Sequence, residues 1–167
     1  GHVTRPAGNC MLLYLLRHAE AEALAESDVV RQLTPKGEQQ AAKVGKFCLK
    51  HGIEPAVILT SPVLRARQTA ERVAKSLTAA ELIEVPWAAC GMDAFKAMEE
   101  LAAYRQLPAV MLVGHQPDLG FLAAALLGLQ NVQNLRVRKA LIAAIDTAAG
   151  LKTGVGKLQF FLPVRLM

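Results

Sequence analysis

Met11-Leu-Leu-Tyr-Leu-Leu16, followed directly by Arg17-His18-Ala19-Glu20, is the stretch of this 167-residue chain that decides the fold. Six consecutive apolar residues are typical of a short strand that is buried on both faces, as in a largely parallel sheet. Runs of the same kind recur at residues 56–60 and 109–113. We therefore expect these segments to be strands of one sheet, each followed by a polar segment.

Helical patterns separate these strands. Thr34-Pro35 offers an N-cap followed by a proline in the first turn, which predicts a helix that runs to about Lys50 and ends near Gly52. Ser61-Pro62 repeats this opening after the second strand, and the apolar residues at 66, 70, 73 and 77 lie on one helical face. One strand-helix unit thus follows another.

The second half of the chain continues the alternation. A weaker strand is expected at 82–85, and helices are expected at 93–104 and 118–127, the latter closed by Gly128. Segments 140–145 and 157–162 look like a closing pair of strands, for which an antiparallel arrangement is one option. Alternating strands and helices predict an α/β fold, a three-layer sandwich with a mostly parallel central sheet and helices on both faces.

Length and composition set the outer limits. The chain has the length of one domain, which we assign to residues 11–167, while residues 1–10 are expected to be a tag or a disordered N-terminal extension. A hydrophobic fraction of 53% excludes a disordered chain. The net charge of +5 leaves nucleic acid, an anionic membrane and a small anionic substrate open as partners.

The cysteines and the apolar runs bear on the location. Cys10, Cys48 and Cys90 form no Cys-x-x-Cys pair, which argues against a disulfide framework or a thiolate zinc site and favours a reducing, cytoplasmic setting. The longest apolar stretch, residues 120–129, is much shorter than the roughly 20 residues that cross a bilayer. We expect no membrane partner, no export and a monomer.

Histidines and arginines follow three of the expected strands. They are Arg17 and His18 after the first, Arg65 after the second and His115 after the strand at 109–113. A lone histidine at a strand end is usually a capping or hydrogen-bonding residue, but binding sites of α/β sheets gather at the carboxyl ends of strands. The first turn of a helix disfavours a cation such as Arg65, and a bound anion would offset that cost. The set predicts a phosphate pocket with a nucleophile.

Four segments that contain these residues follow one another along the chain. They are Arg17-His18-Ala19-Glu20, Leu33-Thr34-Pro35-Lys36-Gly37 with Gln39/Gln40-Ala41, Ser61-Pro62-x-x-Arg65-Ala66-x-Gln68-Thr69-Ala70, and Val113-Gly114-His115-Gln116-Pro117. In this order they resemble the histidine phosphatase superfamily, and the resemblance runs from about Met11 to the C-terminus. The short chain, Ala19 and the stretch Ser27-Asp28-x-x-Arg31-x-Leu33-Thr34 are similar to the bacterial protein phosphohistidine phosphatases of the SixA type.

The resemblance implies a role for each residue. His18 would be the nucleophile, and a backbone carbonyl near the strand end could fix its tautomer. Arg17 and Arg65 would bind the equatorial phosphoryl oxygens, and His115 would be a further donor. No metal and no cofactor are then required. Arg31 is either a substrate contact or a solvated loop residue.

The proton donor is less clearly marked. Asp28, Asp93 and Glu20 are the candidates, and we prefer Asp28 because it lies in the loop after the nucleophile. An imidazole is a better leaving group than an alkoxide and needs less help from an acid. The lack of a clearly marked proton donor therefore favours a substrate with an N–P bond.

These observations predict a metal-independent phosphatase that works through a phosphohistidine intermediate, acting on phosphohistidine in a signalling or phosphotransfer protein. The alternatives are a small-molecule phosphomonoesterase and a non-catalytic phosphoprotein-binding module. Nucleic acid is not expected, because aromatic residues make up only 5% of the chain and offer few stacking platforms. Arg136, Arg138 and Lys139 form a basic cluster that is either a solvated face or a contact for an acidic substrate protein.

Overall fold

A computed structural model describes residues 11–167, so the assignment of residues 1–10 lies outside the described residues. One six-stranded sheet has the strand order β3-β2-β4-β1-β5-β6. The strands are β1 (Leu12–Arg17), β2 (Val57–Thr60), β3 (Glu81–Glu84), β4 (Ala109–Gly114), β5 (Ile142–Asp146) and β6 (Lys157–Leu162). The pairs β1–β4, β4–β2 and β2–β3 are parallel, whereas β5 runs antiparallel to both β1 and β6. The closing pair is therefore antiparallel.

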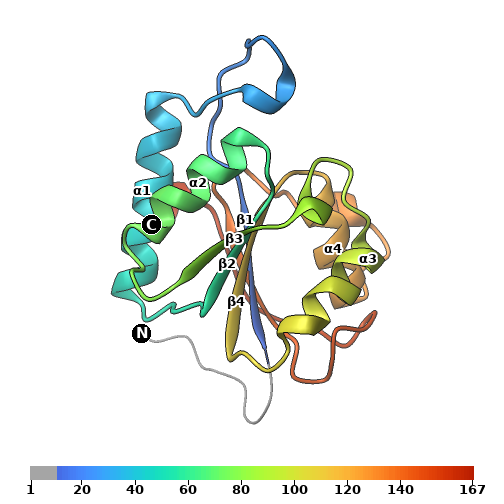
Figure 1. The fold of residues 1–167 in the computed structure, drawn as a ribbon. Coiled ribbons are helices and arrows are strands. Elements are labelled where there is room, and N and C mark those ends of the chain that lie inside the picture. Colours follow the sequence, from blue (N-terminus) through green and yellow to red (C-terminus); the bar gives the residue numbers. More distant parts are fainter. Residues whose placement is uncertain (1–10) are drawn as a thin grey trace.

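Helices cover both faces of the sheet (Figure 1). α1 (Pro35–Lys50) and α2 (Leu64–Ala74) pack on one face, and α3 (Ala94–Leu101) and α4 (Asp118–Leu127) pack on the other. Successive side chains of a strand point to opposite faces. Leu13 and Leu15 accordingly join the apolar cluster under α3 and α4, while Leu12 and Leu16 join the cluster under α1 and α2. The predicted three-layer α/β sandwich is confirmed.

Short 3-10 segments complete the chain. They are η1 (Asp28–Val30), η2 (Pro86–Ala88), η3 (Ala102–Tyr104), η4 (Val132–Asn134) and η5 (Val164–Leu166). Within residues 11–167, none of the helices is both long enough and apolar enough to cross a bilayer.

The ends of two helices follow the predicted signals. The Thr34 hydroxyl accepts a hydrogen bond from the Gly37 N–H at 3.0 Å, Pro35 is the first helical residue, and α1 ends at Lys50 as expected. Gly128 closes α4 with a φ of 73°, a left-handed conformation that favours glycine.

Other boundaries differ from the prediction. α2 begins at Leu64 rather than at Pro62, because the Ser61 hydroxyl accepts from the Val63 N–H and holds a turn between strand and helix. α3 ends at Leu101 and continues only as the 3-10 turn η3. β5 begins at Ile142 rather than at residue 140, because Ala140 has a φ of 60° and cannot extend the strand.

Candidate active site

The register of two parallel strands brings His18 and His115 together. Arg17 at the end of β1 pairs with Gly114 at the end of β4, and the His18 N–H donates to the Gly114 carbonyl at 3.0 Å. The next side chains of the two strands are then neighbours, with ring centroids of His18 and His115 5.4 Å apart. Both histidines lie at the carboxyl edge of the sheet, where sequence reasoning expected them.

The imidazole of His18 is held in one tautomer. Its Nδ1 lies 2.7 Å from the carbonyl oxygen of Ala19, and because a carbonyl only accepts, Nδ1 carries the proton. Nε2 then keeps its lone pair. Burial is the main cause that lowers the pKa of His18 to about 3; the neighbouring His115, Arg65 and Arg17 act in the same direction, and the hydrogen bond to the Ala19 carbonyl acts against them. The ring is therefore neutral at pH 7, the state that a nucleophile requires.

His115 is oriented by a hydroxyl. Its Nε2 lies 2.8 Å from Ser61 Oγ, which already accepts from the Val63 N–H. When the Ser61 hydroxyl donates to Nε2, the proton of the neutral ring is on Nδ1. Burial, followed by the charge of Arg65, lowers the pKa of His115 to about 4. His115 is 3% exposed and also neutral at pH 7.

The two arginines are anchored through their terminal nitrogens. Arg17 Nη1 donates to the Val137 carbonyl at 2.9 Å. Arg65, which is 6% exposed, donates from Nη1 to the Asp28 carbonyl at 2.9 Å and from Nη2 to the Asp28 carboxylate at 3.2 Å. Burial, followed by the charge of Arg65, lowers the pKa of Arg17.

Three buried nitrogens from these side chains have no hydrogen-bond partner among residues 11–167. They are Arg17 Nε, Arg65 Nε and His115 Nδ1. Buried donors in folded proteins are nearly always satisfied. An unpaired set next to the neutral His18 matches what an oxyanion with several acceptor oxygens would fill, since guanidinium groups and imidazoles donate well to phosphoryl oxygens. We regard this as the chemically informative feature of the site.

Asp28 lies at the site as a charged partner of arginines. Its carboxylate contacts Arg31 Nη1 at 3.0 Å and Arg65 Nη2 at 3.2 Å, and its side chain is 59% exposed. The hydrogen bond from Arg31, assisted by Arg65, lowers the pKa of Asp28. A general acid requires the opposite shift. Arg31 is occupied by Asp28 and by the Glu22 carbonyl, to which its Nε donates at 2.6 Å.

The other two candidate acids have different surroundings. Asp93 caps α3, with its carboxylate accepting from the Lys96 N–H at 2.9 Å. Glu20 lies 3.9 Å from Lys36 Nζ at the start of α1.

Three polar residues of the motifs hold the segment around the nucleophile, a role that sequence reasoning did not assign. The Thr69 hydroxyl accepts from the Ala19 N–H at 3.0 Å, and the Gln40 side chain accepts from the Glu20 N–H at 2.9 Å. The Gln68 side chain accepts from the Leu33 N–H at 2.8 Å. Their place in the quoted motifs was the available signal, because polar residues on a buried helix face need partners.

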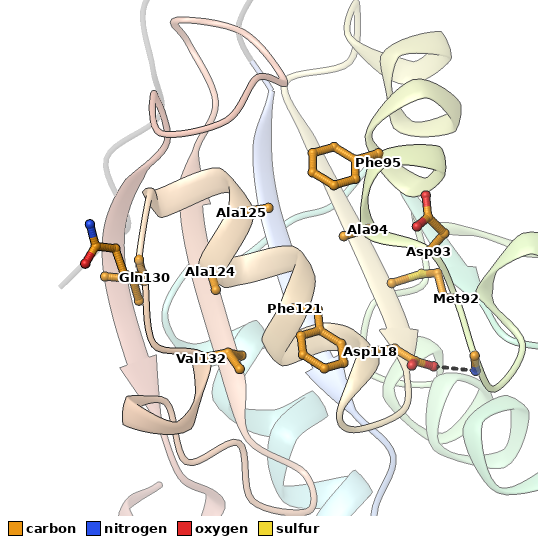
Figure 2. Close-up of a pocket in the computed structure, with 12 residues that line it drawn as sticks. Met92, Asp93, Ala94, Phe95, Asp118, Phe121, Ala124, Ala125, Gln130 and Val132 are labelled. Atoms are coloured by element: carbon orange, nitrogen blue, oxygen red, sulfur yellow. Dashed lines mark hydrogen bonds between the residues drawn. The ribbon is translucent and has the colours of Figure 1, made fainter.

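A cavity of about 630 Å³ lies between the start of α3, α4 and the segment that follows α4 (Figure 2). Met92, Phe95 and Phe121 line it, and the Asp118 carboxylate at its edge accepts from the Gly91 N–H at 2.9 Å. Among the candidate site residues, only Asp93 lines this cavity, and its carboxylate caps α3. The neighbouring Cys90 is nevertheless in contact with the site, since its Sγ accepts from Arg65 Nη2 at 3.5 Å.

Comparisons with known proteins agree with this geometry. The sequence model of the histidine phosphatase superfamily (branch 1) matches residues 13–89. The phosphohistidine phosphatase SixA of Escherichia coli is 30% identical over 119 residues, which cover 70% of this chain and 74% of that protein. The chain belongs to the histidine phosphatase superfamily. It is a SixA-type member and a hydrolase.

Two further relatives have nearly the same extent as this chain. An uncharacterized protein of Picosynechococcus is 38% identical over 157 residues, which cover 89% of each chain. A structure of the protein histidine phosphatase SixA complexed with tungstate superimposes with a TM-score of 0.82 at 25% identity, covering 93% of this chain and 99% of that one. The superfamily member described here therefore matches the SixA-type relatives over most of their length.

Proposed function

We propose that this superfamily member is a metal-independent phosphatase that removes the phosphoryl group from phosphohistidine in a signalling or phosphotransfer protein. The observation that carries the proposal is the set of unpaired nitrogens of Arg17, Arg65 and His115 around the neutral His18. A phosphoryl group supplies acceptor oxygens for all three donors and an electrophile for His18 Nε2.

In the first step, the lone pair of His18 Nε2 attacks phosphorus in line with the bond to the leaving group. An Nε2–P bond forms as the bond from phosphorus to the substrate nitrogen breaks. The electron pair of that bond stays on the substrate ring, which leaves as neutral imidazole when its other nitrogen carries a proton. Nδ1–H of His18 keeps its hydrogen bond to the Ala19 carbonyl, which supports the positive charge that the ring gains. Arg17, Arg65 and His115 donate to the equatorial oxygens as charge spreads over them.

In the second step, water attacks phosphorus and the electron pair of the Nε2–P bond returns to His18. The products are inorganic phosphate and the neutral ring, with the proton from water leaving on phosphate or to solvent. The side chains of Arg17 and Arg65 supply the positive charge that a metal ion provides in other phosphatases, and the neutral His115 adds a hydrogen-bond donor. Metal independence follows from this assignment and belongs to the proposal.

We choose phosphohistidine as the substrate because Asp28 is poorly suited to protonate a leaving group and because the SixA relatives are phosphohistidine phosphatases. Asp28 is ionised and paired with arginines, so we assign it to holding Arg65 rather than to protonating a leaving group. A site in which no carboxylic acid is assigned to protonate the leaving group suits an imidazole leaving group better than an alkoxide. The SixA relatives, one of them from Haemophilus influenzae at 30% identity, support the same substrate class. A cytoplasmic setting suits the free thiols of Cys48 and Cys90.

A substrate panel tests this proposal. The wild-type protein is given a histidine-phosphorylated phosphotransfer protein, p-nitrophenyl phosphate and an alkyl phosphate, each with and without EDTA. We expect the highest kcat/KM for the phosphohistidine protein and no effect of EDTA. A preference for the esters would favour a small-molecule phosphomonoesterase, and binding without turnover of any substrate would favour a phosphoprotein-binding module.

A further inference from the structure

A cavity of about 500 Å³ beside the candidate active site carries an excess of positive charge. It lies between the end of β1, the start of α1, the segment before β5, and η5. Five cations and one carboxylate give its lining a net charge of +4, whereas the whole chain carries +5. We call this cavity the basic groove; the charged residues are Arg17, Lys36, Arg138, Lys139, Arg165 and Glu20.

The segment that carries Arg138 and Lys139 is fixed to the active site. Arg17 lines the groove and donates from Nη1 to the Val137 carbonyl. Ala140 is fully buried, and its N–H points to the carbonyls of both Arg17 and His18, at 3.1 and 3.2 Å. A φ of 60° is costly for alanine and persists only where the surroundings enforce it. The two cations are therefore held next to the strand end that presents His18.

Most cations of the groove have no ion-pair partner among the described residues. Among residues 11–167, the only ion pair in which a groove residue takes part joins Lys36 Nζ to Glu20 at 3.9 Å. Arg138, Lys139 and Arg165 are exposed. Like charges gathered in one hollow repel one another and attract an anionic partner.

We propose that the basic groove binds an acidic segment of the substrate protein, next to the phosphorylated residue. This inference rests on the proposed function, because Arg17 belongs to both the groove and the phosphoryl site, and an occupant of the groove must lie beside the group that is transferred. Carboxylates that are spaced along a peptide can each form an ion pair with a different cation of the groove, and these cations stay largely exposed when they do so. The groove lining contains no aromatic residue for base stacking, which favours a protein segment over nucleic acid.

Peptide binding tests the groove without relying on turnover. Two unphosphorylated fluorescent peptides of equal length, one rich in Asp and Glu and one with Asn and Gln at the same positions, are titrated with the full chain and followed by anisotropy. The variant R138E/K139E reverses two groove charges. The control K46E/K50E reverses two exposed charges ten and fourteen residues after Lys36, about 15–21 Å further along α1.

We expect the wild-type protein and K46E/K50E to bind the acidic peptide equally and to prefer it over the neutral one. R138E/K139E is expected to bind it about tenfold or more weakly, with a shallower dependence on salt. Thermal unfolding checks that the variants fold, and Lys139→Gln is a milder substitution that should weaken binding in the same direction. Equal binding of the acidic peptide by all variants, or of both peptides by the wild type, overturns the proposal.

Two further arms separate this inference from the proposed function. With the same peptides carrying phosphohistidine, we expect a higher kcat/KM for the acidic one in the wild-type protein and loss of this preference in R138E/K139E. Selective binding of the acidic peptide without any hydrolysis would refute the proposed function and leave the groove assignment standing. If a single-stranded DNA of 12 nucleotides binds as tightly as the acidic peptide, the groove binds polyanions in general, which would contradict the groove assignment.

Discussion

Arg65 Nη2 lies 3.2 Å from the carboxylate of Asp28, a residue 37 positions earlier in the chain. The same nitrogen donates to Cys90 Sγ, and Nη1 donates to the Asp28 carbonyl. Three of the five guanidinium N–H groups are thus used within the protein, and we assign the unpaired Nε–H to a phosphoryl oxygen. This division requires the fork geometry of arginine, because a lysine has a single nitrogen.

Replacement of Arg65 by Lys is therefore expected to lower kcat/KM about 100-fold, although the charge is kept. Steady-state kinetics with p-nitrophenyl phosphate measure the effect. Arg67→Lys is the matched control, since Arg67 lies on the same helix and pairs with the half-exposed Glu71 and Glu84. Comparable activity of the Arg65→Lys and Arg67→Lys variants would rule out a forked contact to the phosphoryl group.

The role of Asp28 is tested by the leaving group. Because Asp28 holds Arg65, Asp28→Asn should lower kcat/KM about tenfold for substrates with good and with poor leaving groups alike. The ratio of kcat/KM for p-nitrophenyl phosphate to that for an alkyl phosphate should then stay constant. Glu26→Gln, an exposed carboxylate of the same loop, is the control. A selective loss on the alkyl phosphate would assign proton donation to Asp28.

The low pKa values of His18 and His115 predict that neither ring titrates near neutrality. Folding lowers both pKa values from 6.5 to about 3 and about 4, so both rings should stay neutral from pH 8 down to pH 5. NMR titration of the ring nitrogens measures this, with His18→Gln used for assignment. Saturating phosphate should raise the pKa of His115, because a nearby anion favours the charged ring. A midpoint near 6.5 for either ring in the free protein would be inconsistent with this description.

Gly37 is expected to tolerate no side chain. A Cβ at this position would lie 2.0 Å from the Glu20 carbonyl oxygen, which also accepts from the Thr34 N–H. Gly37→Ala should therefore lower the free energy of unfolding by about 1–3 kcal/mol. In an unobstructed helix the same change would raise it by about 1 kcal/mol. Urea denaturation measures the difference, with the exposed Gln39→Ala as control; equal stability of the two variants would refute the predicted clash.

Local sequence signals were sufficient for the layers of the fold. The apolar runs of β1, β2 and β4 are buried on both faces, so their composition alone marks them as central parallel strands. Thr34, Pro35 and Gly128 mark helix ends because capping depends on adjacent residues. The carboxyl ends of parallel strands lie at one edge of a sheet, which is why Arg17, His18, Arg65 and His115 were expected at one site. The pairing of β1 with β4 that makes His18 and His115 neighbours came only from the structure.

Contacts between distant, irregular segments could not be predicted in the same way. Asp28 reaches Arg65 only through the path of the exposed loop that η1 belongs to, and no periodic pattern encodes that path. The turn at Ser61, which delays α2 and orients His115, depends on a side-chain hydrogen bond that competes with helix formation. The left-handed Ala140 depends on two carbonyls 122 and 123 residues earlier in the numbering.

The central claim is that His18 Nε2 carries the phosphoryl group during turnover. The most direct measurement is a rapid quench of the wild-type protein with radiolabelled phosphohistidine protein, followed by peptide mapping and ³¹P NMR. We expect acid-labile, alkali-stable phosphate on Nε2 of His18, formed and lost at rates compatible with kcat, and neither label nor turnover in His18→Ala. Turnover without a labelled intermediate, or an active His18→Ala protein, would contradict the account.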